Sequence, residues 1–220
     1  MAAPLTPVAG RRLLFIMAHA AEYGPHLRAR FTPLFTGVGP VEAAVTTTAA
    51  LAGLQAAGKL PDLVVCLGSA GSARLEQCGV YQVASVAWRD MDASALGFAP
   101  GATPFLDLPV PLPVLCALPG LPVASLSTGG NVVSGAGYDA LSEDMVDMET
   151  YAVLRACQRF DVPLIGLRGI SDGKTELTGL QDWTAALPNL DARLADAVDL
   201  IAPAIHSGAV ITGQSIAPEG

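Results

Sequence analysis

Residues 62–71 read Asp62-Leu63-Val64-Val65-Cys66-Leu67-Gly68-Ser69-Ala70-Gly71, an apolar run that ends in small residues. A short apolar run bounded by turn-forming residues is typical of a buried strand. We therefore predict a central strand at Leu63–Leu67, followed by a tight turn. Small residues in that turn let either the backbone or a ligand approach closely, and they do not say which.

Similar apolar runs recur along the chain and predict five further strands. They lie at Leu13–Ala18, Pro33–Thr36, Gly79–Trp88, Pro122–Leu126 and Leu164–Ile170. Between strands, apolar residues repeat at three- and four-residue spacing in Pro40–Ala57 and Thr150–Phe160, which predicts helices. Strands that alternate with helices indicate the α/β class, with a mostly parallel sheet covered by helices.

The length and composition suit one compact domain. The 220 residues are 51% hydrophobic, which is enough for a well-covered core, so we expect a single domain over 1–220. Residues 90–120 are rich in Pro, Gly and Ala without a clear period, and we expect a long excursion from the sheet there. We expect the last residues, about 207–220, to form a loosely held terminus.

The charge and the cysteine content limit the classes of partner, ligand and cofactor that we expect. The formal charge is −8 and no Lys/Arg cluster is present, which argues against nucleic acid and anionic membranes as partners. No run approaches the roughly 20 apolar residues of a membrane span. The four cysteines form no C-x-x-C pair and the three histidines have no metal-ligand spacing. We therefore expect a cytoplasmic protein with a small-molecule ligand and with no metal or cofactor.

Polar residues follow several predicted strands, where ligands gather in open parallel sheets. They are His19 and Glu22, the 68–72 segment, the 127–131 segment, and Arg168 to Gly173. Each has an ordinary structural explanation too. Glu22 can favour the dipole of a helix that it begins, Asp172-Gly173 is a common turn pair, and Asp147 can cap the helix that follows it.

Four blocks, in this order and spacing, resemble the purine nucleoside phosphorylase/nucleosidase family over nearly the whole chain. They are Thr36-Gly37-Val38-Gly39-Pro40-Val41-Glu42-Ala43-Ala44, residues 62–71 with their G-S-A-G ending, Val146-Asp147-Met148-Glu149-Thr150, and Arg168-Gly169-Ile170-Ser171-Asp172. The resemblance implies a nucleoside phosphorylase-like fold of three α/β/α layers with a central mixed, mostly parallel sheet. It also implies cleavage of an N-glycosidic bond.

Two positions favour the water-using branch of this family. Phosphorylases carry an arginine where this chain has Cys66, and their phosphate loop is replaced here by Ala18-His19-Ala20-Ala21-Glu22. Nucleosidases resemble one another in keeping a glutamate at the position of Glu22, and a carboxylate can accept a proton from attacking water. The resemblance is greatest to the nucleosidases that cleave 5′-methylthioadenosine and S-adenosylhomocysteine.

The resemblance assigns further roles to individual residues. Asp172 is the acid that protonates the leaving base, Ser171 orients it, and Arg168 organises the carboxylates around the sugar. Glu149 binds the ribose hydroxyls with Met148 beneath the ring. Four residues contact the sugar and base, namely Ser69, Ala70, Val132 and Val133.

The segment from Asp90 to Phe98, with Pro104, is similar to a loop that covers the 5′ tail in these nucleosidases and comes from a neighbouring subunit. The resemblance therefore implies a homodimer with shared active sites. The expected 5′-tail pocket consists of His19, Val38, Ala93, Leu96 and Pro104. His19 stands where relatives have methionine, which fits either a polar 5′ group or a surface histidine.

At three positions this chain differs from the family motifs in ways that affect recognition of the base. Val132 replaces the aromatic residue that stacks on adenine, Gly130 replaces an aspartate, and Asp147 replaces a glutamate. Other nucleosides, such as futalosine or an adenosyl-lipid, are therefore alternative substrates, and phosphorolysis is an alternative reaction. A binding or storage protein of the same fold is the alternative outside enzymes.

Overall fold

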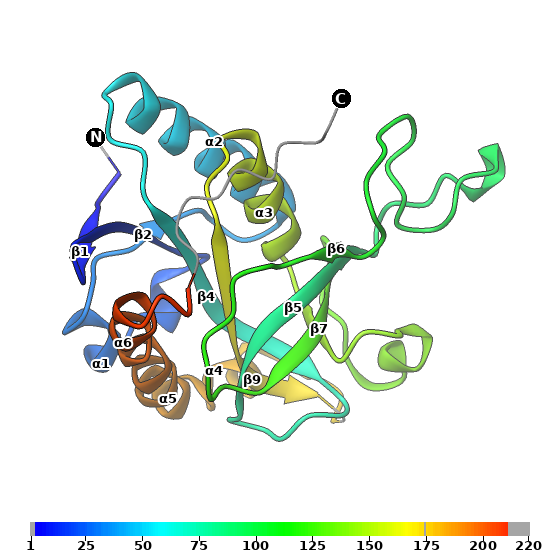
Figure 1. Cartoon of the computed structure of the whole chain (residues 1–220). Helices are drawn as coiled ribbons and strands as arrows, with labels where there is room; N and C mark the ends of the chain where they lie inside the picture. Colours follow the sequence, from blue (N-terminus) through cyan, green and yellow to red (C-terminus); the bar gives the residue numbers. More distant parts are fainter. Residues whose placement is uncertain (1–2, 174, 211–220) are drawn as a thin grey trace.

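The computed structural model describes residues 3–173 and 175–210, and these ranges form a nine-stranded mixed sheet with helices on both faces (Figure 1). The strands are β1 (Thr6–Val8), β2 (Arg11–Met17), β3 (Leu34–Phe35), β4 (Leu63–Ser72), β5 (Val80–Trp88), β6 (Leu112–Pro113), β7 (Val123–Thr128), β8 (Met145–Asp147) and β9 (Leu164–Gly173). Most paired residues lie in parallel ladders, as predicted.

Alternating side chains of the central strands build two cores, one on each face of the sheet. In β2, Leu13, Phe15 and Met17 enter one core, whereas Leu14 and Ile16 enter the other. The first core is covered by α1 (Pro25–Arg28), α5 (Leu187–Asp199) and α6 (Ile201–His206), and the second by α2 (Pro40–Ala56) and α3 (Thr150–Arg159). The predicted α/β/α layers are confirmed, and buried Cys66, Cys116 and Cys157 contribute to these cores.

Strand pairing closes on itself around one part of the sheet. The pairs run from β4 through β9, β5, β7 and β8 and back to β4, where Gly71 pairs with Val146. The ends of these strands therefore lie around a common point. This arrangement brings together sequence blocks that are up to about a hundred residues apart.

The turn predicted after Leu67 is wrong, because β4 continues to Ser72 and β9 continues to Gly173 alongside it. The two strands stay paired beyond a register shift between Ala70 and Gly71. The glycines serve close packing instead of a turn. A Cβ atom on Gly68 would lie 2.8 Å from Nη1 of Arg168, and one on Gly71 would lie 2.9 Å from Oδ2 of Asp172.

The excursion is shorter than predicted. Residues 89–111 extend away from the body of the molecule, with the short η2 helix (Ser94–Leu96) within them (Figure 1). From Leu112 the chain returns to pair with β5, and Leu112, Val114 and Leu118 are buried. Alternating apolar residues in this return segment, not its proline content, decide its structure.

The sequence patterns predicted no helix in the segment after β9. That segment holds α5 and α6, and before them the short helix α4 (Leu180–Thr184). Of the predicted loose terminus, Val210 packs into the first core, and residues 211–220 lie outside the described residues. Within residues 3–173 and 175–210, no helix is long and apolar enough to cross a membrane.

Candidate active site

A cavity of about 600 Å³ opens where β2, β4, β7, β8 and β9 end. Its wall collects most residues that the sequence motifs indicate, namely His19, Glu22, Val38, Ser69, Ala70, Val132, Val133, Met148, Glu149, Ser171 and Asp172. The sheet topology thus gathers residues from six separate segments around one cavity, at the strand ends where ligands bind in such sheets.

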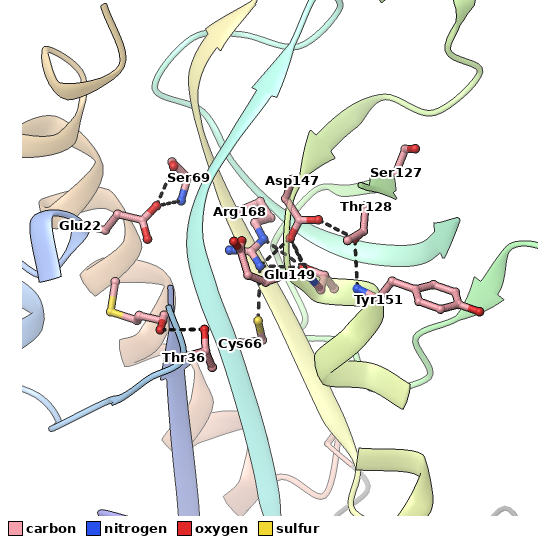
Figure 2. Close-up of polar contacts among 12 residues, drawn as sticks. Glu22, Thr36, Cys66, Ser69, Ser127, Thr128, Asp147, Glu149, Tyr151 and Arg168 are labelled. Atoms are coloured by element: carbon pink, nitrogen blue, oxygen red, sulfur yellow. Dashed lines mark hydrogen bonds and ion pairs between the residues drawn. The ribbon is translucent and has the colours of Figure 1, made fainter. Parts of the chain in front are cut away.

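Glu22 lies in the short η1 helix (Ala20–Glu22) and is only 7% exposed. Its Oε1 accepts hydrogen bonds from the backbone nitrogen of Ser69 at 2.7 Å and from the Ser69 hydroxyl at 2.6 Å (Figure 2). Its Oε2 is buried and has no hydrogen-bond partner among the described residues. One carboxylate oxygen is therefore held, and the other is free to accept a proton.

The turn that carries Glu22 is anchored from α5. The buried carboxylate of Asp191 accepts hydrogen bonds from the backbone nitrogens of His26 at 2.8 Å and Leu27 at 3.1 Å. Gly24 leaves room for it, because a Cβ atom there would lie 2.5 Å from the carboxylate. Glu22 is thus fixed both by β4 and by the helix layer beneath it.

Asp172 lies near the end of β9 and is held by two hydroxyls. Its Oδ1 accepts a hydrogen bond from the Ser171 hydroxyl at 2.5 Å, and the Tyr138 hydroxyl lies 3.4 Å from Oδ2. Burial and the neighbouring Asp172 charge raise the pKa of Tyr138, so the phenol stays a proton donor. The sequence motifs did not indicate Tyr138, which belongs to the η3 helix (Gly135–Ala140).

Glu149 stands at the start of α3, and its Oε1 accepts a hydrogen bond from the backbone nitrogen of Gly39 at 2.8 Å. Burial, and then the nearby charge of Asp147, raise the pKa of Glu149 to about 7. This carboxyl therefore changes its charge close to neutral pH. A ligand hydroxyl or a developing positive charge beside it would favour the ionised form.

Arg168 lies behind the cavity wall and is not among the residues that line it. Its Nη2 lies 2.8 Å from Oδ2 of Asp147 in a buried ion pair, and it also donates to Oγ1 of Thr150 at 2.6 Å and to Sγ of Cys66 at 3.3 Å (Figure 2).

Asp147 confirms the capping interpretation of its position. Its Oδ2 accepts a hydrogen bond from the Thr150 backbone nitrogen at 2.9 Å, in the first turn of α3, and its Oδ1 accepts one from Thr128 at 2.5 Å. The same carboxylate therefore fixes the beginning of α3 and binds Arg168. Met148 and Glu149, which line the cavity, follow it directly.

The segment after β7 is held by Arg89, which the motifs did not indicate, and by Asp90, the first residue of the 90–98 loop motif. Arg89 donates to the backbone oxygens of Ser127 at 2.7 Å and Asn131 at 2.6 Å, and Asp90 accepts from the Gly130 nitrogen at 2.5 Å. Beyond this segment Val133 is buried, whereas Val132 is 68% exposed. The only sequence signal for Arg89 is its place directly after the predicted strand Gly79–Trp88.

The expected 5′-tail pocket is only partly present in one chain. His19 and Val38 line the cavity, and the His19 ring also accepts a hydrogen bond from Ala21 at the start of η1. Ala93, Leu96 and Pro104 lie on the excursion and do not line it. Residues before and within α4 line this cavity instead, namely Leu177, Thr178, Gly179, Leu180 and Trp183.

Metal ligands are not grouped in the part of the chain that the structure describes. No set of three or more His, Cys, Asp or Glu side chains there is arranged to hold an ion. The described site presents carboxylates, hydroxyls and backbone amides, together with the side chains of His19, Arg89 and Trp183.

Comparison with known proteins finds similarity to one family of enzymes. The family model described as the phosphorylase superfamily matches residues 131–203. The 5′-methylthioadenosine/S-adenosylhomocysteine nucleosidase of Staphylococcus aureus (strain MRSA252) is 28% identical over 188 residues, which are 74% of this chain and 78% of that protein. The nucleosidase of the same name from Actinobacillus succinogenes is 29% identical over 157 residues, which are 63% of this chain and 66% of that protein.

Solved structures agree on the fold. The nucleosidase of that name from Neisseria meningitidis, in complex with methylthio-immucillin-A, has a TM-score of 0.68 at 21% identity and covers 84% of this chain and 97% of that chain. A futalosine hydrolase mutant of Helicobacter pylori has a TM-score of 0.67 at 19% identity and covers 86% and 96%. The fold of this chain is thus that of these solved structures, and its sequence is similar to the phosphorylase superfamily over residues 131–203.

The residues matched by the family model, 131–203, include Val132, Val133, Glu149, Asp172 and α5. Cys66 and Glu22 lie outside the matched residues. The distinction between water and phosphate therefore depends on the geometry around Glu22.

The raised pKa of Glu149 predicts a pH-dependent cost of folding. The carboxyl ionises near its ordinary value of 4.5 when unfolded and near 7 when folded. Between these values the folded state binds the extra proton, so the wild type loses stability as the pH rises. Glu149→Gln should avoid this loss and gain up to about 3 kcal/mol relative to wild type between pH 5 and pH 8.

Urea unfolding at the two pH values measures this gain. Glu76→Gln, at an exposed position, is the matched control and should show no such trend. A Glu149→Gln protein whose stability follows that of wild type at both pH values would contradict the assigned pKa.

Proposed function

We propose that this chain hydrolyses the N-glycosidic bond of adenine nucleosides with a 5′-thio substituent, namely 5′-methylthioadenosine and S-adenosylhomocysteine. The products are adenine and the 5-thio-ribose. The observation that carries the proposal is Glu22, a buried carboxylate with one oxygen held by Ser69 and one oxygen free, in the same cavity as Asp172. The names of the relatives agree with this chemistry.

Glu22 acts as the general base in this proposal. A water oxygen attacks C1′ of the ribose while its proton passes to the free Oε2 of Glu22. The bond between C1′ and N9 breaks, and its electron pair goes to the purine. Because the ribose becomes cation-like, the nearby carboxylate of Glu149 stabilises it more strongly in the transition state than in the ground state.

Asp172 acts as the acid. It passes a proton taken up from solvent to N7 of the departing adenine, so that the base leaves neutral, and the carboxylate is stabilised by Ser171 and Tyr138 before and after the transfer. The proposed base contacts come from the backbone of Val132 and Val133. Met148, Ser69 and Ala70 pack against the sugar, and His19 and Val38 are assigned to the 5′ group.

The charges of the cavity favour water over phosphate. Among the lining residues the guanidinium is that of Arg89, which donates to three backbone oxygens, and Arg168 is paired with Asp147 behind the wall. Glu22, Glu149 and Asp172 place acidic groups in the wall. Among the described lining residues, a phosphate ion would meet these acidic groups and no unpaired guanidinium or ammonium group.

Futalosine is the second candidate substrate. The futalosine hydrolase of Helicobacter pylori matches this fold with nearly the same TM-score as the nucleosidase of Neisseria meningitidis. The exposed Val132 in place of an aromatic residue also leaves the face of the base less constrained. Both nucleosides would be cleaved by the same acid and base.

Substrates whose leaving groups differ in basicity distinguish the role of Asp172 from the role of Glu22. In phosphate-free buffer, wild type should release adenine from 5′-methylthioadenosine, and Asp172→Asn should lower kcat by about 100-fold or more. With a 4-nitrophenyl riboside, whose leaving group needs no proton, Asp172→Asn should have little effect. Glu22→Gln should lower both rates, because water must be activated in each case.

Asp139→Asn, at an exposed position, is the charge-matched control. Futalosine and inosine, assayed in parallel, decide between the candidate bases. Base release that begins only when phosphate is added would contradict hydrolysis.

We also propose a cytoplasmic homodimer in which the excursion of each chain covers the 5′ side of the partner's cavity. Exposed apolar side chains support it, because Val41 and Val45 lie uncovered on α2, and Leu96 and Phe105 on the excursion are 76% and 92% exposed. Apolar surface of this extent indicates an interaction site. Ala93, Leu96 and Pro104 would then reach a cavity that they do not line within their own chain.

Leu96→Asp should convert the dimer to a monomer and raise KM for nucleosides with a long 5′ group, as sedimentation velocity and initial rates would report. Val123→Asp, an exposed position at the amino end of β7 and away from the cavity, is the control. A wild-type protein that sediments as a fully active monomer would contradict the dimer.

A further inference from the structure

Trp183 is the one aromatic side chain that lines the cavity among the described residues, and the proposed reaction assigns it no role. It belongs to α4, and its indole Nε1 donates a hydrogen bond to the Ser69 hydroxyl at 2.9 Å across 114 positions of sequence. Ser69 is the residue that holds Glu22. Trp183 therefore contacts the proposed general base through one intervening hydroxyl.

Hydrogen-bonding capacity fixes the direction of this chain of contacts. An indole N–H can only donate, and a serine hydroxyl has a single proton. Because Ser69 Oγ accepts from Trp183, its own proton is directed to Oε1 of Glu22 at 2.6 Å. Together with the Ser69 backbone nitrogen, this gives Oε1 two donors and leaves Oε2 as the open position.

Trp183 is itself held in place. Asp182 accepts hydrogen bonds from the backbone nitrogens of Thr178 at 2.6 Å and Gly179 at 3.2 Å, which fixes the entry to α4. The Trp183 ring packs against the first core, which contains residues of α5 and β9. The indole N–H is thus presented to Ser69 by a supported helix and not by a free side chain.

We propose that Trp183 is a positioning residue for the water-activating carboxylate. It orients the Ser69 hydroxyl so that Glu22 is held as an ionised acceptor with Oε2 open to water. This inference rests on the proposed function of Glu22, but the contact between Trp183 and Ser69 can be tested without catalysis.

A double-mutant cycle separates positioning from packing. Trp183→Phe keeps a ring and removes the donor, and Ser69→Ala removes the relay. Each should lower kcat about 10-fold while KM changes less than about threefold, and the double variant should be no slower than Ser69→Ala. The acidic limb of the kcat profile should move to higher pH in Trp183→Phe, since Glu22 loses support for its ionised form. Trp88→Phe, which alters the other tryptophan, should leave that limb in place.

If the two substitutions lower kcat independently, so that the double variant is slower than Ser69→Ala, the proposal is overturned. An acidic limb that does not move in Trp183→Phe would overturn it as well. Either result leaves the hydrolase assignment intact. A second measurement needs no substrate. The two tryptophans give two indole N–H signals in a nitrogen-15 spectrum, and Ser69→Ala should shift that of Trp183. An unchanged signal would overturn the contact, whereas a wild type that releases no base would instead overturn the proposed function.

Discussion

The buried ion pair between Arg168 and Asp147 is the interaction on which the site depends. Removing two charges from water costs several kcal/mol for each ion, and such a pair persists only where further hydrogen bonds complete it. Thr128, Thr150 and Cys66 provide them here, from β7, α3 and β4. The pair therefore joins five elements, β4, β7, β8, β9 and α3, and it fixes the start of α3, next to which Met148 and Glu149 line the cavity.

Around this pair, the closed circuit of strands divides the chemistry between separate segments. β9 carries Asp172, β4 carries Ser69, and η1 carries Glu22, so the acid and the base belong to different elements and cannot shift together. Gly68 and Gly71 let polar groups of neighbouring segments approach the β4 backbone. The resulting wall is acidic, and an acidic wall favours a sugar that becomes positively charged as its bond to the base breaks.

Six of the strands and the helices α2 and α3 were predictable because their apolar residues repeat locally, whereas the short strands β1, β6 and β8 and the helix α5 were not predicted. Glu22, Ser69 and Asp172 follow predicted strands and Glu149 was indicated by the family resemblance, and the structure gathers all four at one cavity. The turn at 68–71 was misread because small residues are typical both of turns and of closely packed strands. Tyr138, Arg89 and Trp183 were missed, since each acts through a contact with a distant segment, and no local pattern encodes such a contact.

The central claim is that water, activated by Glu22, attacks C1′ of the ribose. The most direct test is the identity of the sugar released from 5′-methylthioadenosine when phosphate is present in excess, determined by mass spectrometry and phosphorus-31 NMR. The account predicts free 5-methylthioribose, formed at a rate that does not depend on phosphate. A sugar 1-phosphate, formed at a rate that rises with phosphate concentration, would contradict it.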